Sequence, residues 1–237
     1  MQNLPTVAGE SGVVVKAFFD AIFFDMDGLL VDSEPQWLES EREITAEYGY
    51  QWRLEDQVVC LGGPLSRVGE YMHNKCGNAQ TPLFFTEKLI AVQAAKMLSQ
   101  TPLMPGAYEL VKSLQSHGVK TGLVSASPRI IVDAVLSNIG SDLFPFSISS
   151  DDVTQTKPHP DAYLKAATIT GSDIKDCLVF EDSLTGVAAA TTSGAWLIAV
   201  PHLVTVEESA RVRSIKSLEK ISYDLLGKLW LDFTYPI

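Results

Sequence analysis

The sequence has few cysteines, no cluster of basic residues and no long uninterrupted apolar run. Its three cysteines are Cys60, Cys76 and Cys177. They show no Cys-x-x-Cys or Cys/His ligand spacing, so neither a disulfide framework nor a zinc site is predicted, and a reduced, cytoplasmic protein is expected. The apolar stretch 12–24 is interrupted by Lys16 and Asp20. It therefore does not fit a signal peptide, and no run approaches the roughly 18 uncharged residues of a membrane span.

The formal net charge of -11 is the strongest bias of the composition, and no run of Lys and Arg offsets it. A surface of this sign repels nucleic acid and anionic membranes, so neither is expected as a partner. A ligand that carries phosphate would need a metal ion, a few cations or backbone N–H groups at its site. The 237 residues, of which 46% are hydrophobic and 20% charged, suffice for one domain with a smaller inserted one.

Short apolar runs alternate with helical patterns along most of the chain. The predicted buried strands are 21–24, 119–124, 144–148, 178–180 and 196–200. The predicted helices between them are 107–116, 128–139, 161–170 and 184–192. This alternation predicts an α/β fold, namely a doubly wound parallel sheet covered by helices on both faces.

Residues 35–100 differ, because they contain helical patterns and no strand-like run. The expected helices are 36–48, 65–75 and 86–98. In the first of them, four acids are assigned to a solvated helix face: Glu39, Glu41, Glu43 and Glu47. The predicted division is a leader without regular structure at 1–16, an α/β core at 17–34 and 101–237, and an inserted α-helical domain at 35–100.

Two acids follow the first strand directly, in Phe24-Asp25-Met26-Asp27-Gly28. Because side chains alternate along a strand, Asp25 and Asp27 can point the same way at the carboxyl edge of the sheet, where open α/β sheets bind ligands. Gly28 permits a tight turn, which would let the N–H groups of Met26 and Asp27 face an anion. A plain Asp-Gly turn gives the same residues, so the assignment depends on the other strand ends.

Polar side chains also follow the later strands. Ser125 comes at the end of strand 119–124 and can donate to a phosphate oxygen, whereas Ser127 is expected to cap the next helix. Lys157 lies just before Pro158-His159-Pro160, which favours a positioned cation. Both residues suit a bound phosphate.

The strand at 178–180 ends in a second acid pair, Glu181-Asp182. Two adjacent acids after an apolar strand are unusual for packing alone, although Asp182 or Ser183 would also cap the following helix. Asp25, Asp27 and Asp182 together supply the oxygen ligands that Mg²⁺ prefers.

These four segments, in this order, resemble the motifs of the haloacid dehalogenase (HAD)-like superfamily over about residues 17–230. The matching residues are Asp25-x-Asp27-Gly28, Ser125, Lys157 and Glu181-Asp182. The resemblance implies a Rossmann-like core with a helical cap inserted between the first two motifs. It also implies a Mg²⁺-dependent phosphatase that acts on a small phosphorylated metabolite. We expect it to act as a monomer.

The resemblance assigns a role to each motif residue. Asp25 would be the nucleophile that becomes a phospho-aspartate, and Asp27 the acid and then the base. Ser125, Ala126 and the Met26 backbone would bind the phosphoryl group, which Lys157 would orient. Mg²⁺ would be held by Asp25, the Asp27 carbonyl and Asp182, with Glu181 direct or through water.

The segments Gly28–Trp37, Ser125–Pro128 and Lys157–Pro160 are most similar to the sugar-phosphate phosphatases of this superfamily that act on 2-deoxyglucose 6-phosphate and hexitol phosphates. β-Phosphoglucomutase is a near relative and stays an alternative, although Trp37 replaces a histidine usual in that branch. A non-catalytic relative of the same fold is a further alternative. The second acid and the Glu181-Asp182 pair argue against a metal-free dehalogenase, and no cap lysine is identified for phosphonatase chemistry.

Substrate selectivity is expected to lie in the helical insert. The loop Leu61–Arg67 is the candidate specificity segment, because its glycines allow close approach and Arg67 can meet a polar group. A helix N-terminus with Arg67 in solvent is an equal alternative. Trp37 and Trp52 are either a sugar-stacking surface or part of a helical core.

Overall fold

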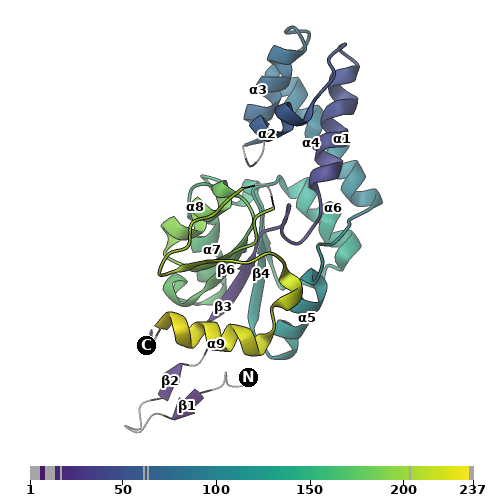
Figure 1. Ribbon diagram of the computed structural model, residues 1–237. Helices are drawn as coiled ribbons and strands as arrows, with labels where there is room; N and C mark the ends of the chain where they lie inside the picture. Colours follow the sequence, from purple (N-terminus) through teal and green to yellow (C-terminus); the bar gives the residue numbers. More distant parts are fainter. Residues whose placement is uncertain are drawn as a thin grey trace.

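The computed structural model describes residues 6–8, 14–16, 18–60, 62, 64–202 and 204–234, and a six-stranded sheet of order β5-β4-β3-β6-β7-β8 lies at its centre (Figure 1). The strands are β3 (Ala21–Phe24), β4 (Lys120–Val124), β5 (Ser147–Ile148), β6 (Leu178–Glu181), β7 (Trp196–Ala199) and β8 (Val212–Ser214). Every neighbouring pair is parallel. The predicted α/β parallel fold is confirmed.

Helices cover both faces of this sheet (Figure 1). They are α5 (Ala107–Ser116), α6 (Arg129–Ile139), α7 (Asp161–Thr170), α8 (Leu184–Ser193) and α9 (Tyr223–Thr234). Side chains of β3 alternate between two apolar clusters: Ile22 and Phe24 pack in the cluster that contains α5, α6 and α9, and Ala21 and Phe23 in the one that contains α7 and α8. Burial on both faces explains why this strand is apolar throughout.

Four helices lie together at one end of the molecule, beyond the sheet (Figure 1). They are α1 (Glu34–Ala46), α2 (Leu54–Cys60), α3 (Leu65–Lys75) and α4 (Pro82–Ser99). The two connections to the sheet run side by side, since Asp32 donates its N–H to the carbonyl of Pro102 and Met104 donates to Leu30, both at 2.9 Å. The chain thus leaves the sheet after β3 and returns beside its exit.

Several elements differ from those that the sequence pattern predicts. The short helix α2, strand β8 and helix α9 were not predicted. Thr6–Ala8 (β1) and Val14–Lys16 (β2) form an antiparallel pair, so the expectation that the leader lacks regular structure is wrong for these segments, while its other residues lie outside the described part. The strand expected at 144–148 is reduced to Ser147–Ile148.

Within the ranges described, no helix combines the length and the apolar character that a membrane crossing requires. The three cysteines are buried and form no disulfide in the structure.

The close contact between α3 and α4 yields a stability test. A Cβ atom on Gly69 would lie 2.6 Å from the Pro82 carbonyl oxygen and 2.9 Å from the Thr86 nitrogen, both of which are backbone atoms. Gly69→Ala should therefore lower the free energy of unfolding by about 1–3 kcal/mol in urea denaturation, although alanine is the better helix former. Gly227→Ala in α9 is the matched control, because its Cβ would meet only the Phe18 ring at 3.7 Å. Equal stability of the two variants would contradict the packing argument.

Candidate active site

The carboxyl ends of three adjacent strands meet at one point of the sheet. Strand β3 leads into Asp25, β4 into Ser125, and β6 ends at Glu181. Strand β3 pairs with β4 on one side and with β6 on the other, so the point is a topological switch of the kind that binds ligands in open α/β sheets. The sheet brings together residues that are far apart in the sequence, as the motif order predicts.

Lys157 lies at the centre of this meeting point. Its ammonium donates to Asp25 Oδ1 at 2.5 Å, to Glu181 Oε1 at 2.7 Å and to the Val124 carbonyl at 2.8 Å. The residue is only 4% exposed. Burial alone would lower the pKa of Lys157, but the Asp25 and Glu181 carboxylates outweigh it and raise that pKa, so the ammonium stays charged. The expected positioned cation is therefore present beside Asp25.

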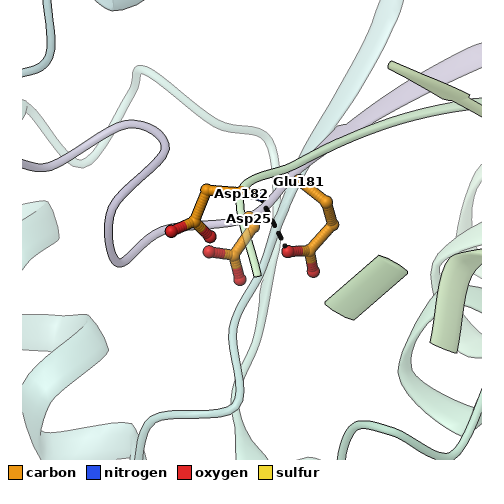
Figure 2. A group of neighbouring side chains, drawn as sticks. All are labelled: Asp25, Glu181 and Asp182. Carbon is orange, nitrogen blue, oxygen red and sulfur yellow. Dashed lines mark hydrogen bonds between the residues drawn. The ribbon is translucent and has the colours of Figure 1, made fainter. Parts of the chain in front are cut away.

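Three carboxyl groups crowd around this one ammonium. One oxygen each of Asp25, Glu181 and Asp182 lies within 4.8 Å of the others, and Figure 2 shows the three groups converging. Burial, followed by the neighbouring carboxylates, raises the pKa of both Asp25 and Asp182. The site holds more negative charge than Lys157 alone can offset.

The same group of oxygens fits a divalent cation. Asp182 Oδ1 is buried and has no hydrogen-bond partner in the described part of the chain. Hard cations such as Mg²⁺ take carboxylate oxygens, and the charge of +2 would offset the excess that raises the pKa of Asp25. Glu181 is less available, since its carboxylate already accepts bonds from Lys157, Tyr163 and its neighbours in the chain.

Two glycines make room for these carboxylates. A Cβ atom on Gly186, in the first turn of α8, would lie 1.8 Å from Glu181 Oε1. A Cβ on Gly28 would lie 2.2 Å from Asp182 Oδ2, and Gly28 also has a φ of +77°. Only glycine permits this approach at these positions. Ser183 fixes the start of α8, because its hydroxyl accepts from the Gly186 N–H at 3.1 Å.

Asp27 has a different set of partners from Asp25. The Trp37 indole donates to its Oδ1 at 3.2 Å and the Ser127 hydroxyl to its Oδ2 at 2.7 Å. The expectation that Ser127 caps the next helix is wrong, since α6 begins after Pro128 without a side-chain cap. The Ser127 hydroxyl reaches Asp27 instead, and the carboxylate is held by a neutral donor on each side.

A cavity of about 490 Å³ opens onto both aspartates. Its wall near the sheet includes Ser125, Ala126 and Lys157, the three residues that the sequence motifs predict to bind phosphate. Ser125 is 2% exposed, and its hydroxyl oxygen accepts from the Ser127 N–H at 3.0 Å, which leaves its own proton to donate.

Three other candidates lie away from the cavity wall. Met26 is fully buried, and Trp52 is 3% exposed among apolar neighbours. Arg67 is exposed and donates to the Val59 carbonyl at 3.1 Å and to the Cys60 carbonyl at 3.5 Å, at the end of α2. Leu61 and Gly63 of the candidate specificity loop lie outside the described residues.

The helices contribute polar residues to the cavity wall that the sequence analysis did not assign to a site: Glu34, Glu41 and Gln57. The placement of Glu41 on a solvated face is wrong, because Glu41 is 3% exposed. The other three acids of that set are more than half exposed, and each pairs with Lys88 or Lys96. Glu34, Trp37 and Glu41 are three and four residues apart, and this helical spacing was the available signal that they share one face.

Known proteins share both the sequence pattern and the fold. The family model described as "Hydrolase: haloacid dehalogenase-like hydrolase" matches residues 19–194. A hexitol phosphatase B of Escherichia coli is 33% identical over 215 residues, which are 87% of this chain and 96% of that protein. A fructose-1-phosphate phosphatase of Escherichia coli is 30% identical over 179 residues, covering 74% of this chain and 93% of the relative.

A solved β-phosphoglucomutase from Clostridium difficile has the same fold, with a TM-score of 0.78 over 91% of this chain and 99% of that one. Its sequence identity is 20%, so the likeness concerns the fold alone.

The close packing at Gly186 leads to a prediction about the site. Gly186→Ala should displace the Glu181 carboxylate and loosen Lys157. We expect the free energy of unfolding to fall by about 2–4 kcal/mol and the rate of p-nitrophenyl phosphate hydrolysis to fall about tenfold or more. Urea denaturation and initial rates measure the two effects. Gly227→Ala serves again as the control helical glycine. Normal stability together with normal rates in Gly186→Ala would show that Glu181 is not held as described.

Proposed function

The chain belongs to the haloacid dehalogenase-like hydrolases, and on this premise we propose that it is a Mg²⁺-dependent phosphatase of small sugar or polyol phosphates that works through a phospho-aspartate on Asp25. Relatives named hexitol phosphatase and fructose-1-phosphate phosphatase support phosphatase activity. The proposed nucleophile, acid–base residue and metal requirement depend on the residues of this chain and not on that likeness.

The observation that carries the proposal is the unlike environment of the two aspartates. Asp25 lies 2.5 Å from the Lys157 ammonium and next to two further carboxyl groups, whereas the side-chain donors to Asp27 among the described residues are the neutral groups of Trp37 and Ser127. An ionised carboxylate beside fixed positive charge suits a nucleophile for phosphorus. A carboxyl group held by neutral donors can gain and lose a proton without breaking an ion pair.

In the first step, an Asp25 oxygen attacks phosphorus and the bond from phosphorus to the ester oxygen breaks. Asp27, in its acid form, gives its proton to the leaving oxygen, so the alcohol departs neutral. The Ser125 hydroxyl, the Ala126 N–H and the Lys157 ammonium would bind the phosphoryl oxygens as charge builds on them. Asp25 then carries the phosphoryl group as an acyl phosphate.

In the second step, water attacks the phosphorus of the phospho-aspartate. Asp27, now ionised, takes a proton from this water, and the Asp25 carboxylate leaves. Phosphate is released, and both aspartates return to their starting protonation states. The net reaction consumes one water and yields the alcohol and inorganic phosphate.

Asp25 and Asp182 would hold Mg²⁺ with the Asp27 main-chain carbonyl, and Glu181 directly or through water. The bound ion would supply positive charge that keeps Asp25 ionised and offsets the phosphate. Helices α1–α4 would act as the cap domain of residues 35–100 over the core of residues 17–34 and 101–237, and would exclude water from the first step. A cytoplasmic location and a monomeric state stay predictions.

The mutase alternative differs in what attacks the phospho-aspartate, a sugar hydroxyl instead of water. No observation favours it here, since likeness to a mutase at 20% identity concerns the fold. An assay with glucose 6-phosphate, 2-deoxyglucose 6-phosphate and β-glucose 1-phosphate separates the two. Release of inorganic phosphate supports the phosphatase, and interconversion of the glucose phosphates without release supports the mutase. An enzymatically silent protein would indicate the non-catalytic alternative.

Replacing the nucleophile is the central test. Asp25→Asn should reduce kcat by about a thousandfold or more while the fold is retained, because an amide does not attack phosphorus. The control is Asp32→Asn, an exposed acid seven positions further on. Initial rates on hexitol phosphates and thermal unfolding give the comparison. Near-normal turnover in Asp25→Asn would end the phospho-aspartate mechanism.

Removing a metal ligand should act differently. Asp182→Asn should raise the Mg²⁺ concentration needed for half-maximal activity about tenfold or more, because one anionic oxygen ligand is lost. A Mg²⁺ titration of initial rates measures it, with the wild type in parallel. An unchanged Mg²⁺ requirement would remove Asp182 from the metal site.

A further inference from the structure

One face of helix α1 is turned toward the catalytic cavity. Glu34, Trp37 and Glu41 are three and four residues apart, which places them on one side of the helix, and all three line the cavity. Trp37 contacts Asp27. Glu41 lies one turn further along, about 6 Å by the rise of an α-helix, and α1 runs away from the sheet (Figure 1).

Glu41 is a buried acid with an unused oxygen. It is 3% exposed, and its Oε2 atom has no hydrogen-bond partner among the residues described. Leaving a buried carboxyl oxygen unpaired costs free energy, so such a group is rarely kept for packing. Glu41 lines the cavity, and a ligand bound there could supply the missing partner.

The neighbours of Glu41 satisfy one another and leave its Oε2 atom open. Gln57 donates to Glu34 Oε2 at 3.2 Å and accepts from the Trp52 indole at 3.5 Å. Apolar side chains, including Val58 and Val68, also line the cavity. Glu41 therefore keeps one open carboxyl oxygen at the wall of a largely apolar cavity, as in sites that fix the orientation of a ligand.

The protonation state of Glu41 suits a hydroxyl ligand. Burial, followed by the nearby Glu34 carboxylate, raises the pKa of Glu41 to about 8, and a hydrogen bond from Trp52 opposes the rise. The raised pKa favours a neutral Glu41 side chain at pH 7. A neutral carboxyl group donates one hydrogen bond and accepts others, and an alcohol hydroxyl does the same.

We propose that Glu41 binds a hydroxyl of the leaving alcohol, remote from the phosphate, and so selects polyol and sugar phosphates over esters of apolar alcohols. This inference rests on the proposed function. The phosphoryl group would lie at Asp25, the ester oxygen at Asp27 beside Trp37, and the hydroxylated chain along α1 to Glu41. Arg67 does not line the cavity, and it donates to carbonyls at the end of α2.

The test uses two esters of similar length, sorbitol 6-phosphate and n-hexyl phosphate, with Mg²⁺ present. Glu41→Leu removes the polar group at similar size, and Glu41→Gln keeps a neutral donor and acceptor. Glu43→Gln is the matched control on the same helix, since Glu43 is exposed and pairs with Lys96. Each variant is compared with the full-length wild type by kcat/KM on both esters.

Glu41→Leu should lower kcat/KM on sorbitol 6-phosphate by about 10- to 100-fold and change that on n-hexyl phosphate less than about twofold, because only the first ester loses a hydrogen bond. Glu41→Gln should retain most of the preference, and Glu43→Gln all of it. An equal effect of Glu41→Leu on both esters, or none on either, would overturn the inference.

Stability gives a second, independent reading. If Glu41 serves the ligand, Glu41→Leu should leave Tm unchanged or raise it, because an unpaired buried polar atom is replaced by a packed apolar one. A lower Tm with parallel losses on both esters would assign Glu41 a structural role and overturn the inference. A wild type that hydrolyses neither ester would instead refute the proposed function, and the inference with it.

Discussion

The ammonium of Lys157, enclosed between Asp25 and Glu181, is the contact on which the site depends. It also donates to the Val124 carbonyl, so one cation ties together the ends of β3, β4 and β6. A buried ion pair of this kind often adds little net stability, because both partners lose their hydration. Its value lies in geometry: the Asp25 carboxylate is held in one place at the edge of the sheet, facing the cavity.

Several other features follow from keeping this charge in the interior. Tyr163 donates to Glu181 Oε1 at 2.6 Å, and its ring lies 5.0 Å from the Lys157 ammonium. Gly186 and Gly28 have no side chain because carboxylates occupy that space. Three carboxyl groups still face one ammonium, and this excess of negative charge is the physical reason for inferring a cation site. Burying this charge costs stability, and it keeps a site suited to charged ligands.

The sheet and the catalytic edge could be predicted, because both follow from local patterns. Strands buried on two faces are continuously apolar, and in a parallel sheet their polar ends must meet at one edge. The partner of Ser127 could not be predicted, since Asp27 is 100 positions away. Glu41 was misplaced because acids recur around α1 at positions 34, 39, 41, 43 and 47. Their spacing places Glu34, Trp37 and Glu41 on one face of the helix, but it does not show that this face lines a cavity closed by other helices.

Under the proposed mechanism, the contact between Trp37 and Asp27 would link the choice of substrate to the chemistry. Asp27 is held from the sheet side by Ser127 and from α1 by Trp37, so its orientation depends on where α1 lies. A leaving alcohol that binds along the same face of α1 would fix the position of that helix and hold Trp37 against Asp27. Binding energy from a remote hydroxyl would then be used to align the proton donor. On the proposed mechanism, a poorly fitting alcohol would lose turnover as well as affinity, because Asp27 would no longer be held in place to protonate it.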